Sequence, residues 1–475
     1  MLQAQDGGHA YLELFRLVNA QPAYDEVQIR KQLGKHFKGN FKKLKHATFQ
    51  NILRGLERYF AGSTDEILVL RKLIQAEILF DKKLFSAARK NIQGAIDLAE
   101  KKDLLFFKLH CYEWSYRLAV AAAQPQEAIR AIGTDKMKKA VQDCGRWLEL
   151  KHLNALFWNF IHTSAETATH EEKKLLSHII VETKGILKQA SAGFTISKDA
   201  YSLLALALRF NGKLEESYSY RLKLASLIET DKVLVYERAY SYISALGMLV
   251  NISRELGKYD DMKVAYEKAK QFMEQLPRKY FNLRLDESSC NVFNNYITGL
   301  FVNQNYDQVI VQGEELMARI KKHSAVFQNS LLSILYQSLM YSYFYRKNYK
   351  VAMKYHHLHI KTHPLDEQKN KKDYIFRKLF GLVILFEMGD RDALHYQCRT
   401  LSYYMKKNKE QHAAEILLVK AFGGTLQKKY SQREMQSDFS SLLLDMTKEK
   451  ERFDQIRKAH KFDYLAWVSS KAATK

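Results

Sequence analysis

The chain has 475 residues, with 75 Lys and Arg against 52 Asp and Glu, which gives a formal net charge of +23. It has only 20 glycines and 4 prolines, whereas apolar residues make up 47% of the sequence. So few chain breakers exclude a collagen-like or largely disordered chain and disfavour an all-β one, because turns consume Gly and Pro. The apolar content suffices for a large core, and length alone would suggest about three domains.

Neither the N-terminus nor the cysteines mark an exported protein. The four cysteines, Cys111, Cys144, Cys290 and Cys398, lie at least 33 residues apart, so neither a zinc site nor a disulfide framework is indicated. The first residues lack the basic and apolar regions of a secretory signal, and no apolar run approaches the roughly 18 residues of a membrane helix. The sequence therefore predicts a soluble, cytoplasmic protein.

The middle of the chain repeats one pattern: an apolar helical stretch, a short polar break, an aromatic residue or Leu, and a second helical stretch. The breaks come before Phe85, Leu214, Tyr259, Tyr306, Tyr349 and Arg391. The last five positions are 42–47 residues apart, and weaker breaks near Pro125 and Thr169 fall within the long interval before Leu214. Residues 65–410 are therefore predicted to form a repeat array of about eight helix–turn–helix units.

The breaks have a physical cause in the chemistry of helix ends. In Phe210–Glu216 and Leu256–Asp261, Gly or Asn is expected to close the first helix in the left-handed conformation. An acidic residue then opens the second helix at the positive end of its dipole. The four prolines, Pro22, Pro125, Pro277 and Pro364, also fall at predicted helix ends, which favours one continuous array over three domains.

Both ends of the array are expected to be capped by helices. Residues 1–62 are predicted to form an N-terminal helical cap, and residues 411–475 are predicted to form C-terminal capping helices and a short tail. The stretch Ser431–Arg457 places Phe439, Leu442, Leu443 and Met446 on one face. It is therefore predicted to be a single amphipathic helix that shields the last repeat.

The turn pattern resembles that of the tetratricopeptide repeat (TPR), with a small residue, an aromatic two positions on and a small residue three further. Gly257 with Tyr259 and Tyr349 with Ala352 fit this pattern in part, whereas Met262 stands where the family has alanine. The period also exceeds the usual 34 residues or so. The resemblance implies an all-α protein, a right-handed α-solenoid of helix–turn–helix repeats.

The two ends of the chain resemble a narrower family of long, uncharacterised bacterial TPR-like proteins. Tyr11–Phe15 and Asn51–Leu56 are similar to its N-terminal helical cap, and Phe462–Trp467 is similar to its C-terminal aromatic segment. This resemblance covers most of the chain. It implies fold and architecture only, because no activity is assigned to that family.

The cluster His356, His357, His359 and His363 invites interpretation as a metal site, because His359 and His363 would share a helix face. The repeat register offers another interpretation. In the TPR pattern the residues seven and ten positions after the turn aromatic pack between helices, and after Tyr349 these are His356 and His359. No carboxylate lies at ligand spacing, so the sequence favours structural histidines and predicts no metal and no cofactor.

The motifs of common catalytic sites are missing from the sequence. It contains no phosphate-binding loop, dinucleotide fingerprint, nucleophile elbow or zinc-protease string. The paired Gly423 and Gly424 are expected in a helix–helix turn, and Cys144 is interpreted as a buried thiol because no histidine lies near it. We therefore expect a non-enzymatic protein without catalytic residues.

The first helix of each unit is expected to line the concave face of the array, as the TPR resemblance implies. Counting back from the turn aromatics places six candidate partner-binding residues there: Arg209, Asn251, Arg254, Asn294, Gln337 and Tyr341. Amide, aromatic and guanidinium side chains suit the backbone of an extended protein segment. A merely solvated face fits the same residues, and the sequence leaves both interpretations open.

The excess of positive charge favours anionic partners by long-range attraction. The first hypothesis for function is therefore a scaffold that binds an extended, acidic protein or peptide segment on the concave face. The alternative is a basic helical repeat that associates with nucleic acid. The sequence pI of about 9.5 is compatible with this alternative, although no RNA- or DNA-binding motif is present.

Overall fold

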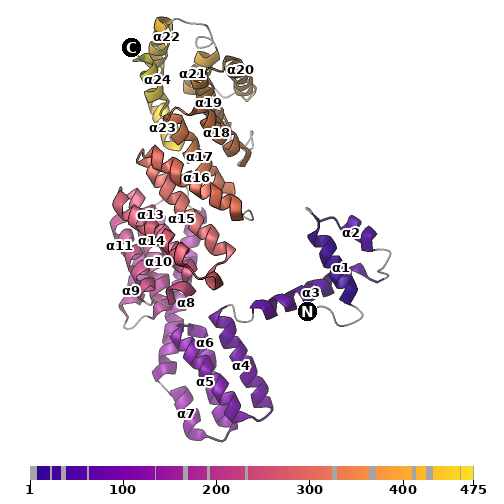
Figure 1. Ribbon diagram of the computed structural model, residues 1–475. Helices are drawn as coiled ribbons and strands as arrows, with labels where there is room; N and C mark the ends of the chain where they lie inside the picture. Colours follow the sequence, from indigo (N-terminus) through magenta and orange to yellow (C-terminus); the bar gives the residue numbers. More distant parts are fainter. Residues whose placement is uncertain are drawn as a thin grey trace. The chain divides into compact units, whose positions relative to one another are not determined.

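The chain is helical throughout the part that the computed structural model describes. That part comprises residues 8–21, 24–33, 39–60, 64–133, 135–163, 170–189, 193–230, 234–323, 329–362, 371–408, 413–423, 432–460 and 462–473. No strand occurs within these ranges, and no helix within them is long and apolar enough to cross a membrane. The prediction of an all-α protein is confirmed (Figure 1).

The chain divides into two compact units, Met1–Leu203 and Leu204–Lys475. The first unit opens with three helices that share a small apolar cluster of their own. These helices are α1 (Gly8–Asn19), α2 (Glu26–Leu33) and α3 (Phe41–Phe60). Leu14, Ile29 and Phe41 form the buried centre of the cluster. The predicted borders at residues 62, 65 and 410 stay predictions.

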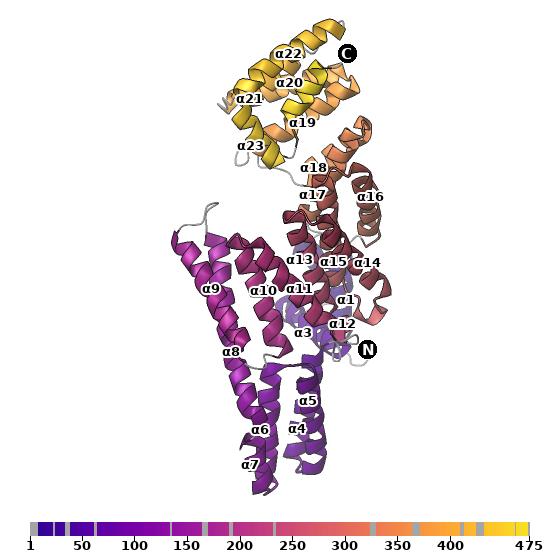
Figure 2. The ribbon, with the colours of Figure 1, turned by 90° about the vertical axis from the view of Figure 1, so that its left-hand side faces the viewer.

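The rest of the first unit is a set of antiparallel helix pairs. Its helices are α4 (Asp65–Asp81), α5 (Phe85–Lys101), α6 (Leu105–Ala121), α7 (Pro125–Gly133), α8 (Asp135–Thr163) and α9 (His170–Lys188). Helix α6 packs on both α4 and α8, and α4, α5 and α6 run side by side in both views (Figures 1 and 2). Val69, Ile92 and Trp114 lie in the buried core between these helices. Pro125 is the first residue of α7, as expected of a proline at a helix start.

The second unit continues the pairs. It contains α11 (Leu214–Glu229), α12 (Leu234–Glu237), α13 (Ala239–Glu255), α14 (Tyr259–Gln275), the 3₁₀ helix η1 (Arg278–Tyr280), α15 (Leu283–Val302), α16 (Tyr306–His323), α17 (Asn329–Tyr345), α18 (Tyr349–Thr362), α19 (Lys371–Met388), α20 (Arg391–Lys407), α21 (Ala413–Gly423), α22 (Gln432–Lys448), α23 (Lys450–His460) and α24 (Tyr464–Ala472). Helix α10 (Phe194–Phe210) crosses the border between the units.

The first helices of successive pairs pack against one another in the second unit. Helix α13 contacts α15, and α15 contacts α17, while each second helix packs on its own first helix. Figure 1 shows this succession from α13 to α19. Counted over the described ranges, eight helix pairs lie between α4 and α20, and the prediction of stacked helix–turn–helix units is confirmed.

Within the described ranges, eight tight turns share one backbone geometry. Two positions before the next helix, each has a residue with positive φ: Lys83, Asp103, Ala123, Gly212, Gly257, Gln304, Lys347 and Gly389. In one of them Lys213 N–H donates to the carbonyl oxygen of Leu208 (2.9 Å), which satisfies an otherwise free end of α10. The expected left-handed Gly occurs in three turns. The expected Asn does not: in the three described turns that contain asparagine, the residue with positive φ is Gly212, Gln304 or Lys347.

The predicted single helix over Ser431–Arg457 is wrong. Helix α22 ends at Lys448 and α23 begins at Lys450, and Glu449 N–H donates to the carbonyl oxygen of Met446 (3.0 Å). Phe439 and Met446 are fully buried and Leu442 and Leu443 are half-buried, so the predicted face points inward although the helix is interrupted.

Candidate partner-binding site

The first helices of the second unit leave a stripe of side chains accessible. On α13 this stripe contains Ser244, Met248, Asn251 and Glu255, which are half-buried or exposed between buried neighbours. Asn291, Asn295 and Thr298 form the same kind of stripe on α15. We call the accessible side chains of these helices the first-helix face: Arg209, Ser244, Met248, Asn251, Glu255, Asn291, Asn295, Thr298 and Gln337.

Arg209 and Arg254 lie at the C-terminal ends of α10 and α13. Arg209 is exposed, and its Nε donates to Glu255 Oε2 (2.8 Å), which joins the two helices through an ion pair. Arg254 is half-buried beside Asn251, and burial lowers the pKa of its guanidinium, an effect that the charge of Arg209 reinforces. The two arginines and Glu255 leave this end of the face positive.

The predicted amides differ in how far they reach solvent. Asn251 and Gln337 are half-buried and belong to the accessible stripes of α13 and α17. Asn294 is only 3% exposed, and its Nδ2 lies 3.5 Å from the carbonyl oxygen of Leu331 on α17. Its Oδ1 atom is buried without a hydrogen-bond partner. Asn294 therefore lies between α15 and α17 rather than on the accessible surface.

Tyr341 is buried in a cluster of aromatic rings. Its ring stacks on Phe301 of α15 and on Phe462, which lies just before α24, and it meets the edge of Phe380 at a centroid distance of 4.6 Å. Burial raises the pKa of its hydroxyl well above the usual range of tyrosine. The C-terminal segment thus covers the position that the repeat register assigns to the concave face.

Sequence counting missed Asn295 and Met248. Gly247 and Asn294, which lie twelve residues before Tyr259 and Tyr306, are buried, whereas Met248 and Asn295, one position further on, are accessible. Gly247 lies so close to α15 that an added Cβ would come within 2.8 Å of Val292 Cγ2. Gly247 is the feature of the sequence that indicates a buried contact at this position, because a close helix–helix approach requires a small residue.

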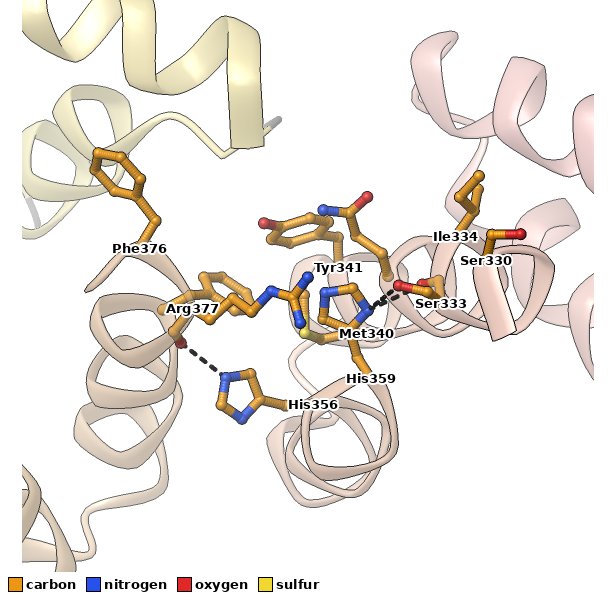
Figure 3. A pocket seen from close by; sticks show the side chains of 11 residues that line it. Ser330, Ser333, Ile334, Met340, Tyr341, His356, His359, Phe376 and Arg377 are labelled. Atoms are coloured by element: carbon orange, nitrogen blue, oxygen red, sulfur yellow. Dashed lines mark hydrogen bonds between the residues drawn. The ribbon is translucent and has the colours of Figure 1, made fainter. Parts of the chain in front are cut away.

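A pocket opens at the end of the face, where α17, α18 and α19 meet (Figure 3). Its volume is about 290 Å³. The lining combines aromatic, apolar and polar groups, among them Gln337, Tyr341, Phe376, Arg377 and Phe380. This composition suits the side chain of a docked protein segment, with apolar walls and a few polar groups that orient it.

Two histidines complete the pocket wall and are held by backbone oxygens. His356 Nε2 donates to the carbonyl oxygen of Arg377 (2.9 Å), and His359 Nδ1 donates to that of Ser333 (3.0 Å; Figure 3). Burial lowers the pKa of His356 to about 4. Both side chains are less than 7% exposed, as expected of residues that pack between helices.

The other candidate groups are buried or fall outside the described residues. Within the described ranges no three His, Cys, Asp or Glu side chains gather as metal ligands, and His363 lies outside these ranges. Cys144 is buried, and burial raises the pKa of its thiol. Gly424 also lies outside the described ranges.

Comparison with known proteins gives little beyond this architecture. No protein-family model matches the sequence, and no curated protein matches it either. Among solved structures, the TPR domain of P58(IPK) aligns over 86% of this chain and 99% of its own, with 13% sequence identity and a TM-score of 0.19. The architecture is assigned from the helix pairs themselves. By their arrangement, the described helices form an all-α repeat of stacked helix–turn–helix pairs.

Proposed function

We propose that the protein is a non-enzymatic interaction scaffold that docks an extended, acidic protein segment on the first-helix face. The observation that carries this proposal is the row of uncharged hydrogen-bonding side chains on successive first helices. Asn251 on α13, Asn295 and Thr298 on α15 and Gln337 on α17 are all accessible in part. Side-chain amides both donate and accept, so they match the N–H and C=O groups of an extended backbone.

Two features support a segment that is acidic. At the C-terminal ends of α10 and α13, Arg209 and Arg254 lie beside the carboxylate of Glu255, and the whole chain has a formal net charge of +23. Such a field attracts an acidic segment from a distance and orients it along the face. The pocket beside Gln337 offers a place for one larger side chain of that segment.

The test is an affinity pull-down from the native cell with a triple variant, Asn251→Ala, Asn295→Ala and Gln337→Ala. We expect the variant to lose the protein partners that the wild type retains. The matched control removes three exposed amides from second helices, Gln271→Ala and Gln275→Ala on α14 and Gln308→Ala on α16. The control should retain every partner, because these side chains lie away from the first-helix face.

The outcome that contradicts docking on this face is a triple variant that recovers the same proteins as its control. Each pull-down is repeated after nuclease treatment. Partners that disappear with nuclease would favour the nucleic-acid alternative, and a filter-binding titration would then show affinity falling steeply with salt.

A further inference from the structure

The charged side chains buried in the described part of the chain differ in whether a group of opposite charge lies beside them. Four such residues are less than 5% exposed: Asp143, Arg221, Asp286 and Glu415. Each of the three carboxylates contacts an arginine: Asp143 with Arg146, Asp286 with Arg319 (2.5 Å) and Glu415 with Arg452 (2.6 Å). Arg221 has no carboxylate partner among the described residues. A buried charge without a counterion is strongly unfavourable, so Arg221 calls for an explanation.

At the position of Arg221 in two other repeat units, the side chain donates a hydrogen bond to an oxygen atom. Arg221 lies seven residues after Leu214, the same position that Tyr266 and His356 occupy in their own units. Tyr266 Oη donates to Gln312 Oε1 (2.5 Å), and His356 Nε2 donates to a backbone carbonyl oxygen. Among the described residues, Arg221 makes one hydrogen-bond contact, from Nη1 to the Sδ atom of Met248 on α13. A thioether is a weak acceptor, and it has no charge to offset that of the guanidinium.

The surroundings of Arg221 add positive charge. Burial and the like charge of Arg209 lower the pKa of Arg221 to about 10. Arg209 also interacts with Arg254, and Glu255 is the carboxylate that pairs with Arg209. Three arginines against one glutamate leave a net surplus of two positive charges where α10, α11 and α13 meet.

Met248 connects Arg221 to the accessible surface. It is half-buried on the same stripe of α13 as Asn251 and Glu255, so it belongs to the first-helix face, and its thioether contacts the guanidinium of Arg221. Methionine is unbranched and changes rotamer readily. A rotation of the Met248 side chain would bring Arg221 into contact with a group docked on the face, without movement of a helix.

We propose that Arg221, with Arg209 beside it, is an oxyanion-binding site for the segment that docks on the first-helix face. The inference rests on the proposed function and names the chemistry that the docked segment presents there. A guanidinium fork binds a carboxylate or a phosphate through parallel hydrogen bonds, and either group would supply the missing counterion. The carboxylate of an acidic side chain and a phosphorylated side chain share this chemistry.

The test compares the thermal unfolding midpoints of the wild-type protein and the Arg221→Met variant, each alone, with inorganic phosphate and with a glutamate-rich peptide. Without an anion, Arg221→Met should unfold at a higher temperature than the wild type, because it removes an unpaired buried charge. Phosphate, the peptide or both should raise the wild-type midpoint. Arg221→Met should lose that rise, with binding weakened at least tenfold.

The matched control is Arg346→Met, which removes an exposed arginine that pairs with Asp307. It should keep the full anion response. If Arg221→Met fails to fold, Arg221→Gln gives the same comparison with a neutral polar side chain. A response to phosphate alone assigns a phosphorylated group, and a response to the peptide alone assigns a carboxylate.

Two results would overturn the site. One is an equal anion response of the wild type and Arg221→Met, and the other is a lower midpoint for Arg221→Met in the absence of anions, which would make Arg221 a structural residue. Failure of the proposed function can be distinguished from failure of the anion site. In that case the triple variant of Asn251, Asn295 and Gln337 would keep its partners, while Arg221→Met would still lose the anion response.

Discussion

His356 illustrates how a single residue can couple the packing of a repeat to pH. Its ring lies against Gly381 of α19, where an added Cβ would come within 2.9 Å of His356 Cε1. Its Nδ1 atom is buried without a partner. Burial is the main cause of its low pKa, and the positive charges of His357, Lys378 and Arg377 add to it. The folded protein therefore holds this ring neutral.

Stability should decrease as the pH falls below the unfolded pKa of histidine. The folded pKa of His356 is about 4, against 6.5 for a model histidine, so the unfolded chain binds the proton first. Its contribution to the free energy of unfolding is present above pH 6.5 and should fall by about 2 kcal/mol between pH 7 and pH 5. Urea unfolding at several pH values measures this slope. The His356→Gln variant should lose it.

The neighbouring His357 provides the control for this experiment. His357 is exposed, so His357→Gln should keep the pH dependence of the wild type. An unchanged slope in His356→Gln would mean that His356 is not the group responsible.

Individual face residues were harder to predict than the face itself. The sequence register places Asn294 on the surface, but the next residue, Asn295, is the accessible one, because successive residues point about 100° apart around a helix. Tyr341 is covered by Phe462, which lies 121 positions further along the chain. Local periodicity cannot indicate a contact between residues so far apart. Arg221 was not singled out from the sequence, because nothing local to it shows that its guanidinium is buried without a carboxylate in the described part of the chain.

At the scale of the helix pair, the turns were the most predictable feature. The polar breaks before Phe85, Tyr259, Tyr306 and Tyr349 all coincide with the start of a helix. The break before Leu105, where Asp103 adopts the left-handed conformation, was not predicted. Since five of the eight described turns have a non-glycine residue with positive φ, composition alone understates the number of turns.

The backbone strain in these turns can be relieved by replacing the residue with positive φ by glycine. Ala123 has a φ of 53°, a conformation that costs an L-residue about 1–2 kcal/mol. Ala123→Gly removes this strain but increases the entropy of the unfolded chain, so we expect a net stabilisation of about 0.5–1 kcal/mol. Urea unfolding of the two variants Ala123→Gly and Ala122→Gly provides the comparison. Ala122 has a φ of −84°, so its replacement should not stabilise the protein.

Greater stability of Ala122→Gly than of Ala123→Gly would contradict the backbone argument. The same substitution is available at Lys347, whose φ is 60°, and should have the same sign there.

At the scale of the whole molecule, the C-terminal segment completes the core of the second unit. Phe462 is 1% exposed and meets the rings of Tyr341, Phe344 and Phe380. Trp467 Nε1 donates to Glu387 Oε1 (2.7 Å), and Lys471 binds the same carboxylate. Residues after α23 therefore belong to the fold of this unit. The sequence pointed to this segment only through a family resemblance.

Phe462→Ala should destabilise the second unit by about 3–5 kcal/mol, the usual effect of removing a fully buried aromatic ring. Two compact units can unfold separately, so the loss is measured on the denaturant transition assigned to Leu204–Lys475. The control is Phe281→Ala in the same unit, where the side chain is 37% exposed. Equal losses for the two variants would show that Phe462 has no special role in the core.

The position of Phe462 also limits the size of what can dock. Accessible side chains occur on α10, α13, α15 and the first half of α17, and beyond that point the ring of Phe462 covers Tyr341. Packed helices lie about 8–10 Å apart, so four of them span roughly 30 Å. An extended chain advances about 3.3 Å per residue. In the proposed docking mode the C-terminal segment would limit the docked part of a partner to about nine residues.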